Sequence, residues 1–99
     1  MIKNVYIFDI DGVLVDSSHR FRSLPDCEKL DLPYWLENQT EEKINQDKLL
    51  PLAGLYKHLL KIPSAYVIMA TARQCIEADF NYISERLGDA DHFIYRQLG

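Results

Sequence analysis

Two aspartates, Asp9 and Asp11, follow directly after the apolar run of residues 5–8, and Gly12 comes next. A buried parallel strand delivers a carboxylate to the carboxyl edge of its sheet in this way. Carboxylates two residues apart can divide phosphoryl transfer, because one attacks phosphorus while the other handles the leaving-group proton. Asp9 and Asp11 are therefore the candidates for these two catalytic roles.

Gly12 permits the tight backbone that brings amide groups close to a bound phosphate. Asp9 and Asp11 also offer the oxygen ligands that Mg²⁺ prefers, and the ion would neutralise both the nucleophile and the transferring group. The alternative is an ordinary turn at the end of a strand, with no role in chemistry. We expect a Mg²⁺ site at these two aspartates and phosphate binding at Gly12.

A second apolar run, residues 65–70, ends at Thr71, Ala72 and Arg73. The threonine hydroxyl could hydrogen-bond a phosphate oxygen and place it in line with the nucleophile. Arg73 could bind a phosphate through two parallel hydrogen bonds. We predict that all three residues bind substrate and that Thr71 and Arg73 are catalytic. The alternatives are a helix cap at Thr71 and an ion pair of Arg73 with Glu77.

The elements that must position these residues alternate between strand and helix. A third apolar run, residues 92–95, is followed by Arg96. Residues 51–61 and 76–87 carry apolar side chains at helical spacing, and Gly88 suits a left-handed helix end. This β-α-β-α-β order predicts an α/β, minimal Rossmann-like three-layer fold with a short parallel sheet of about three strands.

Residues 17–46 fit neither period, and we expect them to form a small cap-like insertion with one or two short helices over the carboxyl edge of the sheet. Residues 40–43 suit a capped helix start. His19 and Arg20 could contact a substrate phosphate or base, and three aromatic residues could stack on a base: Phe21, Tyr34 and Trp35. The alternative is a small aromatic core with a solvated arginine.

The composition is that of an ordinary globular protein, with 47% hydrophobic and 26% charged residues in 99. This length predicts a single domain, residues 1–99. The net charge of −4, without a basic block, argues against general nucleic-acid affinity. We expect Cys27 and Cys75 to be free thiols. The sequence shows neither a signal peptide nor an apolar run of about 18 residues, so we expect a cytoplasmic protein without a membrane interaction.

The string DIDGVLVD, residues 9–16, resembles the first signature of the haloacid dehalogenase (HAD) phosphohydrolase superfamily. Thr71 after an apolar strand resembles the second signature. The resemblance implies Mg²⁺-dependent hydrolysis of a phosphomonoester, with Asp9 forming an aspartyl-phosphate.

Three segments are more specifically similar to the phosphatase domain of bacteriophage-type polynucleotide kinase: residues 16–20, residues 71–73, and Tyr95 with Arg96. This resemblance implies a nucleotide or a nucleic-acid 3′-phosphate as the substrate, and otherwise a phosphorylated small molecule.

Complete HAD enzymes also carry a third-motif Lys or Arg and a fourth-motif acidic pair, and neither is visible here. No lysine follows Arg73, although Arg73 or Arg96 could replace it. Asp89 and Asp91 precede the third strand and should lie at the opposite end of the sheet from the catalytic pair. We therefore expect a truncated HAD-like domain.

Truncation would leave the first strand at an edge, which we expect to be covered by the insertion, by a second copy in a homodimer, or by another protein. Two further alternatives follow for the function. The chain could be a degenerate module that binds phosphate or a protein partner without turnover. It could also be part of a longer protein or complex that completes the site.

Overall fold

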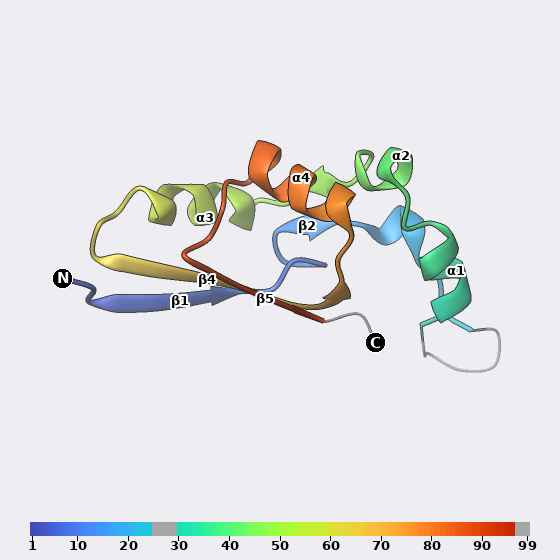
Figure 1. The fold of residues 1–99 in the computed structure, drawn as a ribbon, viewed down its shortest axis with the longest axis horizontal. Helices are drawn as coiled ribbons and strands as arrows, with labels where there is room; N and C mark the ends of the chain where they lie inside the picture. Colours follow the sequence, from blue (N-terminus) through green and yellow to red (C-terminus); the bar gives the residue numbers. More distant parts are fainter. Residues whose placement is uncertain (25–29, 97–99) are drawn as a thin grey trace.

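Three strands rich in β-branched and aromatic residues form a parallel sheet in the order β1-β4-β5 (Figure 1). The structure is a computed structural model that describes residues 1–24 and 30–96. Strands β1 (Asn4–Phe8), β4 (Ala65–Gln74) and β5 (His92–Arg96) confirm the predicted α/β fold. Because Phe8 pairs with Met69 and Ala70 pairs with Ile94, the carboxyl ends of all three strands meet at one edge.

The two predicted crossover helices are confirmed as α3 (Leu52–Leu60) and α4 (Glu77–Arg86). Gly88 has a φ of +93° after α4, as the predicted helix end requires, and its N–H donates to the carbonyl of Ile83 over 2.8 Å. The core lies between these helices and the sheet, where the Phe8 and Tyr56 rings meet edge to face at 5.5 Å.

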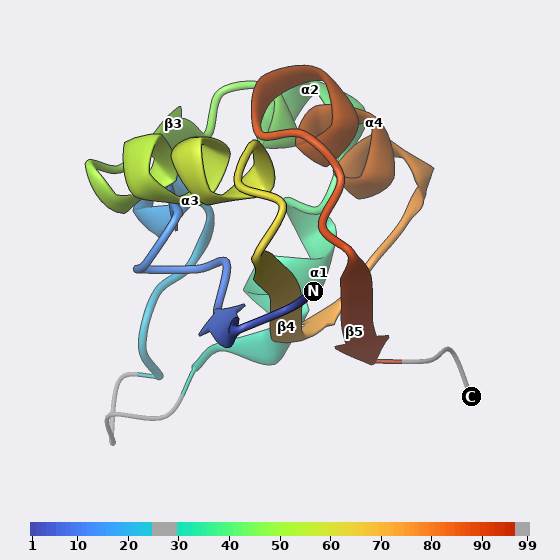
Figure 2. The same cartoon turned by 90° about the vertical axis from the view of Figure 1, so that its left-hand side faces the viewer.

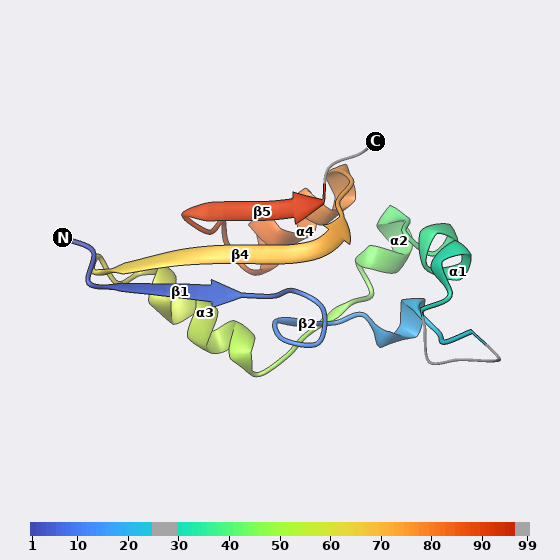
Figure 3. The same cartoon turned by 90° about the horizontal axis from the view of Figure 1, so that it is seen from below.

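The described residues form two of the three expected layers, because α2, α3 and α4 all lie on the same side of the sheet (Figures 2 and 3). Seen from below in Figure 3, no helix lies in front of the sheet. Val5 and Ile7 are consequently 59% and 67% exposed. The predicted three-layer fold would bury β1 on both faces. That burial is not found in this structure, since none of the described residues forms a layer against the second face.

The insertion contains a 3₁₀ helix, η1 (Ser18–Arg20), and the two short helices that were expected, α1 (Leu32–Glu37) and α2 (Glu41–Ile44). Thr40 caps α2 by accepting a hydrogen bond from the Lys43 N–H, as predicted. Two short strands, β2 (Val15–Asp16) and β3 (Lys48–Leu49), pair antiparallel at the base of the insertion and were not predicted.

Helix α1 lies beyond the carboxyl ends of the sheet strands, where the insertion was expected (Figure 1). Cys75 is a buried free thiol, as predicted, and Cys27 falls outside the described residues. Across residues 1–24 and 30–96, no helix is long and apolar enough to cross a membrane. In the same part of the chain β1 pairs with β4 alone, so the covering of its other edge stays a prediction.

Candidate active site

The turn after β1 places Asp9 and Asp11 on the side of the chain that faces away from the core. Phe8 and Ile10 are buried, whereas Asp9 is exposed and Asp11 is half-buried. This alternation is that of an extended chain, in which successive side chains point to opposite faces. Burial of the two apolar residues therefore presents both carboxylates at the carboxyl edge of the sheet.

Gly12 shapes this turn. Its φ is +79°, and its N–H donates to the carbonyl of Val15 over 2.9 Å, while the N–H groups of Leu14 and Val15 donate to the carbonyl of Ile10. A Cβ at Gly12 would meet no atom within 4 Å, so an alanine would be opposed by backbone strain alone. Glycine is thus required by the backbone conformation, and phosphate binding at Gly12 stays a prediction.

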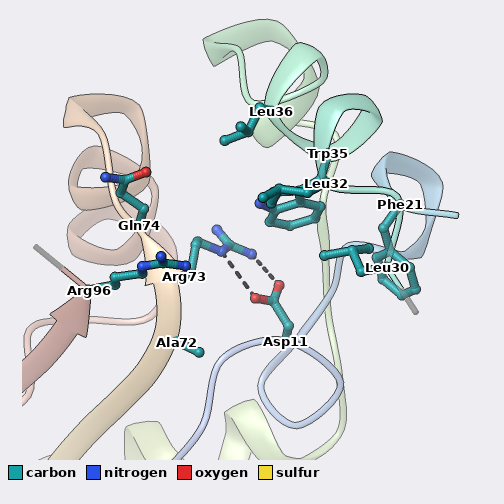
Figure 4. Close-up of a pocket in the computed structure, with 10 residues that line it drawn as sticks. All are labelled: Asp11, Phe21, Leu30, Leu32, Trp35, Leu36, Ala72, Arg73, Gln74 and Arg96. Carbon is teal, nitrogen blue, oxygen red and sulfur yellow. Dashed lines mark hydrogen bonds and ion pairs between the residues drawn. The ribbon is translucent and has the colours of Figure 1, made fainter. Parts of the chain in front are cut away.

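Asp9 and Asp11 differ in how far their oxygens are already engaged. Oδ1 of Asp9 accepts one hydrogen bond, from the N–H of Ile10 at 2.7 Å, and Oδ2 accepts none from the described residues. Asp11 accepts from the Ser17 hydroxyl at 2.5 Å and from two nitrogens of Arg73, Nε at 3.2 Å and Nη2 (Figure 4). One oxygen of Asp9 therefore has no hydrogen bond from the described residues, whereas both oxygens of Asp11 are engaged as acceptors.

Arg73 is the central cation of the site and is only 6% exposed. Besides Asp11, its Nη1 donates to Asp79 over 2.6 Å, and its Nη2 lies 3.8 Å from Asp47. Burial acts to lower the pKa of Arg73, but the hydrogen bonds and charges of Asp11 and Asp79 outweigh it and raise the pKa above its ordinary value. Arg73 therefore stays charged beside three carboxylates. The alternative of a pair with Glu77 is wrong.

Asp79 fixes Arg73 to the start of α4. It is 1% exposed and lies in the first turn of the helix, where its Oδ2 accepts from the N–H of Ile76 at 2.9 Å and from the Gln39 amide at 3.2 Å. A carboxylate at this position satisfies an otherwise unpaired helix N–H and is favoured by the helix dipole. The same side chain thus stabilises the helix end and orients the arginine.

Asp47 holds a second arginine, Arg20, which is fully buried. Nε and Nη2 of Arg20 donate to the two carboxylate oxygens of Asp47 over 2.9 and 2.7 Å, and His19 Nε2 lies 2.7 Å from Oδ1. The Arg20 guanidinium lies 4.4 Å from the centre of the Trp35 ring. The solvated arginine considered from the sequence is therefore wrong, and substrate contact by Arg20 or His19 stays a prediction.

Thr71 and Ala72 lie inside β4, which continues to Gln74 instead of ending at Ala70 as expected. The pairing with β5 shifts register between Ala70 and Gln74, so the strand bends here. The Thr71 hydroxyl oxygen accepts from the N–H of Arg73 at 3.0 Å. Because α4 begins beyond Ile76, Thr71 is not its cap. The phosphate role of Thr71 stays a prediction.

A cavity of about 470 Å³ opens at this edge of the sheet, between the strand ends and the insertion (Figure 4). Its strand wall consists of Asp11, Ala72, Arg73, Gln74 and Arg96. Its insertion wall consists of Phe21, Leu30, Leu32, Trp35 and Leu36. A polar wall thus faces an apolar one.

The predicted site residues fall into three groups in this structure. Three line the cavity: Asp11, Ala72 and Arg73. Three lie at the same sheet edge, outside the cavity lining: Asp9, Gly12 and Thr71. Arg20 lies behind the insertion wall, against Trp35.

The two cations considered as replacements for the third-motif lysine, Arg73 and Arg96, both reach the cavity. Asp91 accepts from the N–H of Val67 near the start of β4, so it lies at the opposite end of the sheet, as predicted. Sequence reasoning missed Asp47 and Asp79, which neutralise the two buried arginines. The one available signal was that Asp79 follows the Thr71–Arg73 segment at a helix start.

The donor set suits Mg²⁺ only in part. The described ranges, 1–24 and 30–96, contain no group of three or more His, Cys, Asp or Glu side chains that could hold a metal ion. Mg²⁺ does not need such a group, since it is often bound by one or two carboxylates together with water and substrate phosphate oxygens. The exposed Asp9, with one oxygen free of hydrogen bonds to described residues, fits that mode, whereas Asp11 is engaged by Arg73.

Two comparisons with known proteins point to the same family. Residues 1–89 match the family described as bacteriophage T5 5′-deoxynucleotidase. The 5′-deoxynucleotidase of Escherichia phage T5 is 33% identical over 87 residues, which make up 86% of this chain and 36% of that protein. The chain thus spans about a third of the length of this relative.

No solved structure matches the chain. The two matches support a nucleotide phosphatase family and not specifically the polynucleotide kinase phosphatase domain that the motifs resembled. With nine-tenths of its residues inside the match, this chain belongs to the bacteriophage T5 5′-deoxynucleotidase family.

Proposed function

We propose that this chain carries the reactive centre of a Mg²⁺-dependent nucleotide phosphohydrolase, with Asp9 as nucleophile and Asp11 as general acid and then base. The observation that supports it most is that two carboxylates lie at one sheet edge beside the buried cation Arg73. Asp9 has one oxygen without a hydrogen bond from the described residues, and Asp11 is bound by Arg73. Family membership and the resemblance of residues 9–16 to the HAD signature point the same way.

In the first step a carboxylate oxygen of Asp9 attacks phosphorus, and the bond between phosphorus and the ester oxygen breaks. The leaving alkoxide takes a proton from Asp11, and the phosphoryl group remains on Asp9 as an aspartyl-phosphate. In the second step water attacks the same phosphorus and gives its proton to Asp11. The bond to Asp9 then breaks, and inorganic phosphate leaves.

Arg73 has two alternative partners in this scheme. In the present structure it donates to both oxygens of Asp11, so both oxygens are engaged as acceptors. A bound phosphate would compete for the same guanidinium through two parallel hydrogen bonds. Arg73 would then neutralise phosphate charge while Asp11 is released to carry a proton. Asp79 keeps the arginine at the cavity in both states.

Asp9, together with water and phosphate oxygens, would hold Mg²⁺, which would supply charge neutralisation at the nucleophile and the phosphoryl group. Asp11, the second predicted ligand, would contribute only while it carries no proton and Arg73 has moved from it. These assignments are testable apart from the family, because metal dependence and metal binding are measured directly.

The substrate class proposed from the family is a 5′-deoxynucleotide, since the relative in phage T5 is named 5′-deoxynucleotidase. The sequence resemblance to the polynucleotide kinase branch keeps a nucleic-acid 3′-phosphate as the second class. Phosphate release should therefore be measured from deoxynucleoside 5′-monophosphates, from 3′-phosphorylated oligonucleotides and from an aryl phosphate, each with Mg²⁺ and with EDTA. Release that requires Mg²⁺ and Asp9 is the expected result.

A second candidate function is a phosphate-binding module without turnover. One observation favours it: both oxygens of Asp11 are engaged by Arg73. Calorimetry with a deoxynucleotide distinguishes the two functions. Binding without phosphate release, at equal affinity in the parent chain and in Asp9→Asn, would overturn the hydrolase in favour of this module.

A further inference from the structure

The insertion wall of the cavity presents more apolar surface than a structural role explains. Four of its side chains are close to half exposed, Phe21 at 43%, Leu30 at 45%, Leu32 at 49% and Leu36 at 47%. In the described structure these side chains face one cavity together and are not scattered over the surface. A contiguous apolar wall of this kind marks a binding site, because covering it with an apolar group is favourable.

The shape of the cavity defines what could cover this wall. The strand wall opposite offers the cation Arg73 and the amide of Gln74, with Arg96 at the end of β5 (Figure 4). A matching ligand therefore has an anionic end for Arg73 and an apolar body for the opposite wall. The volume of about 470 Å³ lies in the range of small-ligand sites.

We infer that the insertion wall is the subsite for the nucleobase, so that the base, and not the phosphate alone, selects the substrate. This inference rests on the proposed function. Phe21 offers the stacking surface, since its ring is half exposed and lies 6.2 Å from Trp35. Leu32 and Leu36, one helical turn apart on α1, cover the base from the same side. The phosphate then lies toward Arg73.

Trp35 is a fixed back surface of the subsite and not the stacking platform. It is 8% exposed, and the guanidinium groups of Arg20 and Arg73 lie 4.4 and 5.5 Å from its ring centre. Cation–π contacts of this kind hold the indole in place. Because Trp35 is the single tryptophan of the chain, its fluorescence reports on this cavity alone.

The first test uses a ligand without phosphate, so that it does not depend on catalysis. A deoxynucleoside is titrated into the parent chain while Trp35 fluorescence is recorded, with 2-deoxyribose as the ligand that lacks a base. We expect saturable quenching by the deoxynucleoside and none by the sugar. Leu36→Ala should raise the dissociation constant about tenfold.

A matched control is Leu55→Ala. Leu55 and Leu36 are both 47% exposed leucines on helices, but Leu55 belongs to α3 and does not line the cavity. The control should leave the dissociation constant unchanged. Thermal melting of both variants excludes a general loss of folding as the cause of any difference.

The second test compares hydrolysis of a deoxynucleoside 5′-monophosphate with that of 2-deoxyribose 5-phosphate. Leu36→Ala should raise KM for the nucleotide about tenfold, leave kcat unchanged, and leave kcat/KM for the sugar phosphate unchanged. Equal losses on both substrates, or no loss on either, would overturn the base subsite while hydrolysis itself stands. Binding of the deoxynucleoside to a chain that hydrolyses neither substrate would keep the subsite and overturn the proposed function.

Discussion

The two walls of the cavity are built on opposite principles. The strand wall carries charged groups that are already paired, such as Arg73 with Asp11 and Asp79, on the ends of hydrogen-bonded strands. The insertion wall carries apolar side chains, four of them close to half exposed, on the six-residue helix α1, at Leu30, and at Phe21 after η1. Arg73 and Asp11 of the strand wall thus have hydrogen-bond partners without a ligand, whereas the apolar side chains of the insertion wall remain partly exposed.

This difference separates chemistry from recognition. Reacting groups require positions fixed by rigid elements, because small displacements lower the rate of phosphoryl transfer steeply. A subsite for an apolar body requires only complementary surface, which a short helix can provide. Changes in the strand wall should therefore act on kcat, and changes in the insertion wall on KM and substrate choice.

The largest effect is expected at Asp9, at the same edge as the strand wall. Asp9→Asn should lower kcat by at least about 10⁴-fold, because it removes the proposed nucleophile. The free energy of unfolding should stay nearly unchanged, since Asp9 is exposed and makes a single hydrogen bond with the described residues. Steady-state phosphate release measures the change in kcat, and urea denaturation measures the free energy of unfolding. Asp89→Asn, at the far end of the sheet, is the control that should keep full activity.

The next prediction concerns how well the thiol directly after β4 is protected from solvent. Cys75 follows β4, and burial, with the charge of Asp79, raises the pKa of its thiol from 9.0 to about 12. In a Cys27→Ser background its reaction with a thiol reagent at pH 8 should be slower than in the urea-unfolded chain by roughly 10³-fold. Reactivity of the folded chain should rise about tenfold with each pH unit above 8, because the thiolate fraction does so below the pKa. Equal rates at pH 8 would show that the wall opens readily.

Arg73 tests whether the paired charges of the strand wall are needed for both folding and catalysis. Arg73→Gln should lower kcat by about 10²-fold, through lost stabilisation of phosphate charge. It should also lower the free energy of unfolding by about 3–5 kcal/mol, because Asp79 is left buried without its cation. Arg73→Lys keeps the charge but not the two parallel hydrogen bonds, so it should recover stability more than kcat.

The smallest effect is expected in the insertion wall. Phe21→Ala should raise KM for a deoxynucleotide about tenfold, the size of one lost stacking contact, with little change in kcat. Unfolding should change by less than about 1 kcal/mol, since the ring is half exposed. A drop in kcat with unchanged KM would instead show that Phe21 contributes to the chemical step. It would contradict the assignment of catalysis to one wall and substrate binding to the other.

The sequence predicted the parts of the site that depend on local pattern. The strand before Asp9, the glycine after Asp11 and the glycine that ends α4 each have a short-range signal, and each has the expected conformation. Crossover helices in a β-α-β order fix a parallel sheet, so the meeting of Asp11 and Arg73 at one edge also followed.

What depends on distant pairing was not predicted. Asp47 and Arg20 lie 27 residues apart in the chain, so no local pattern joins them. The shared edge of Arg73 and Asp11 was predicted, but their ion pair, across 62 residues of chain, was not. The exposure of Val5 and Ile7 was missed for a different reason. A continuous apolar strand indicates two covered faces, but it does not specify which segment covers the second one.

The most direct test of the account is whether the phosphoryl group passes through Asp9. The chain is mixed with a deoxynucleotide bearing ³²P in its phosphate, quenched in acid within one turnover, and examined for label on the protein. We predict label on the parent chain, less label on Asp11→Asn, which cannot give a proton to the leaving alkoxide, and none on Asp9→Asn. Phosphate release without labelled protein, or label that persists in Asp9→Asn, would contradict Asp9 as the nucleophile.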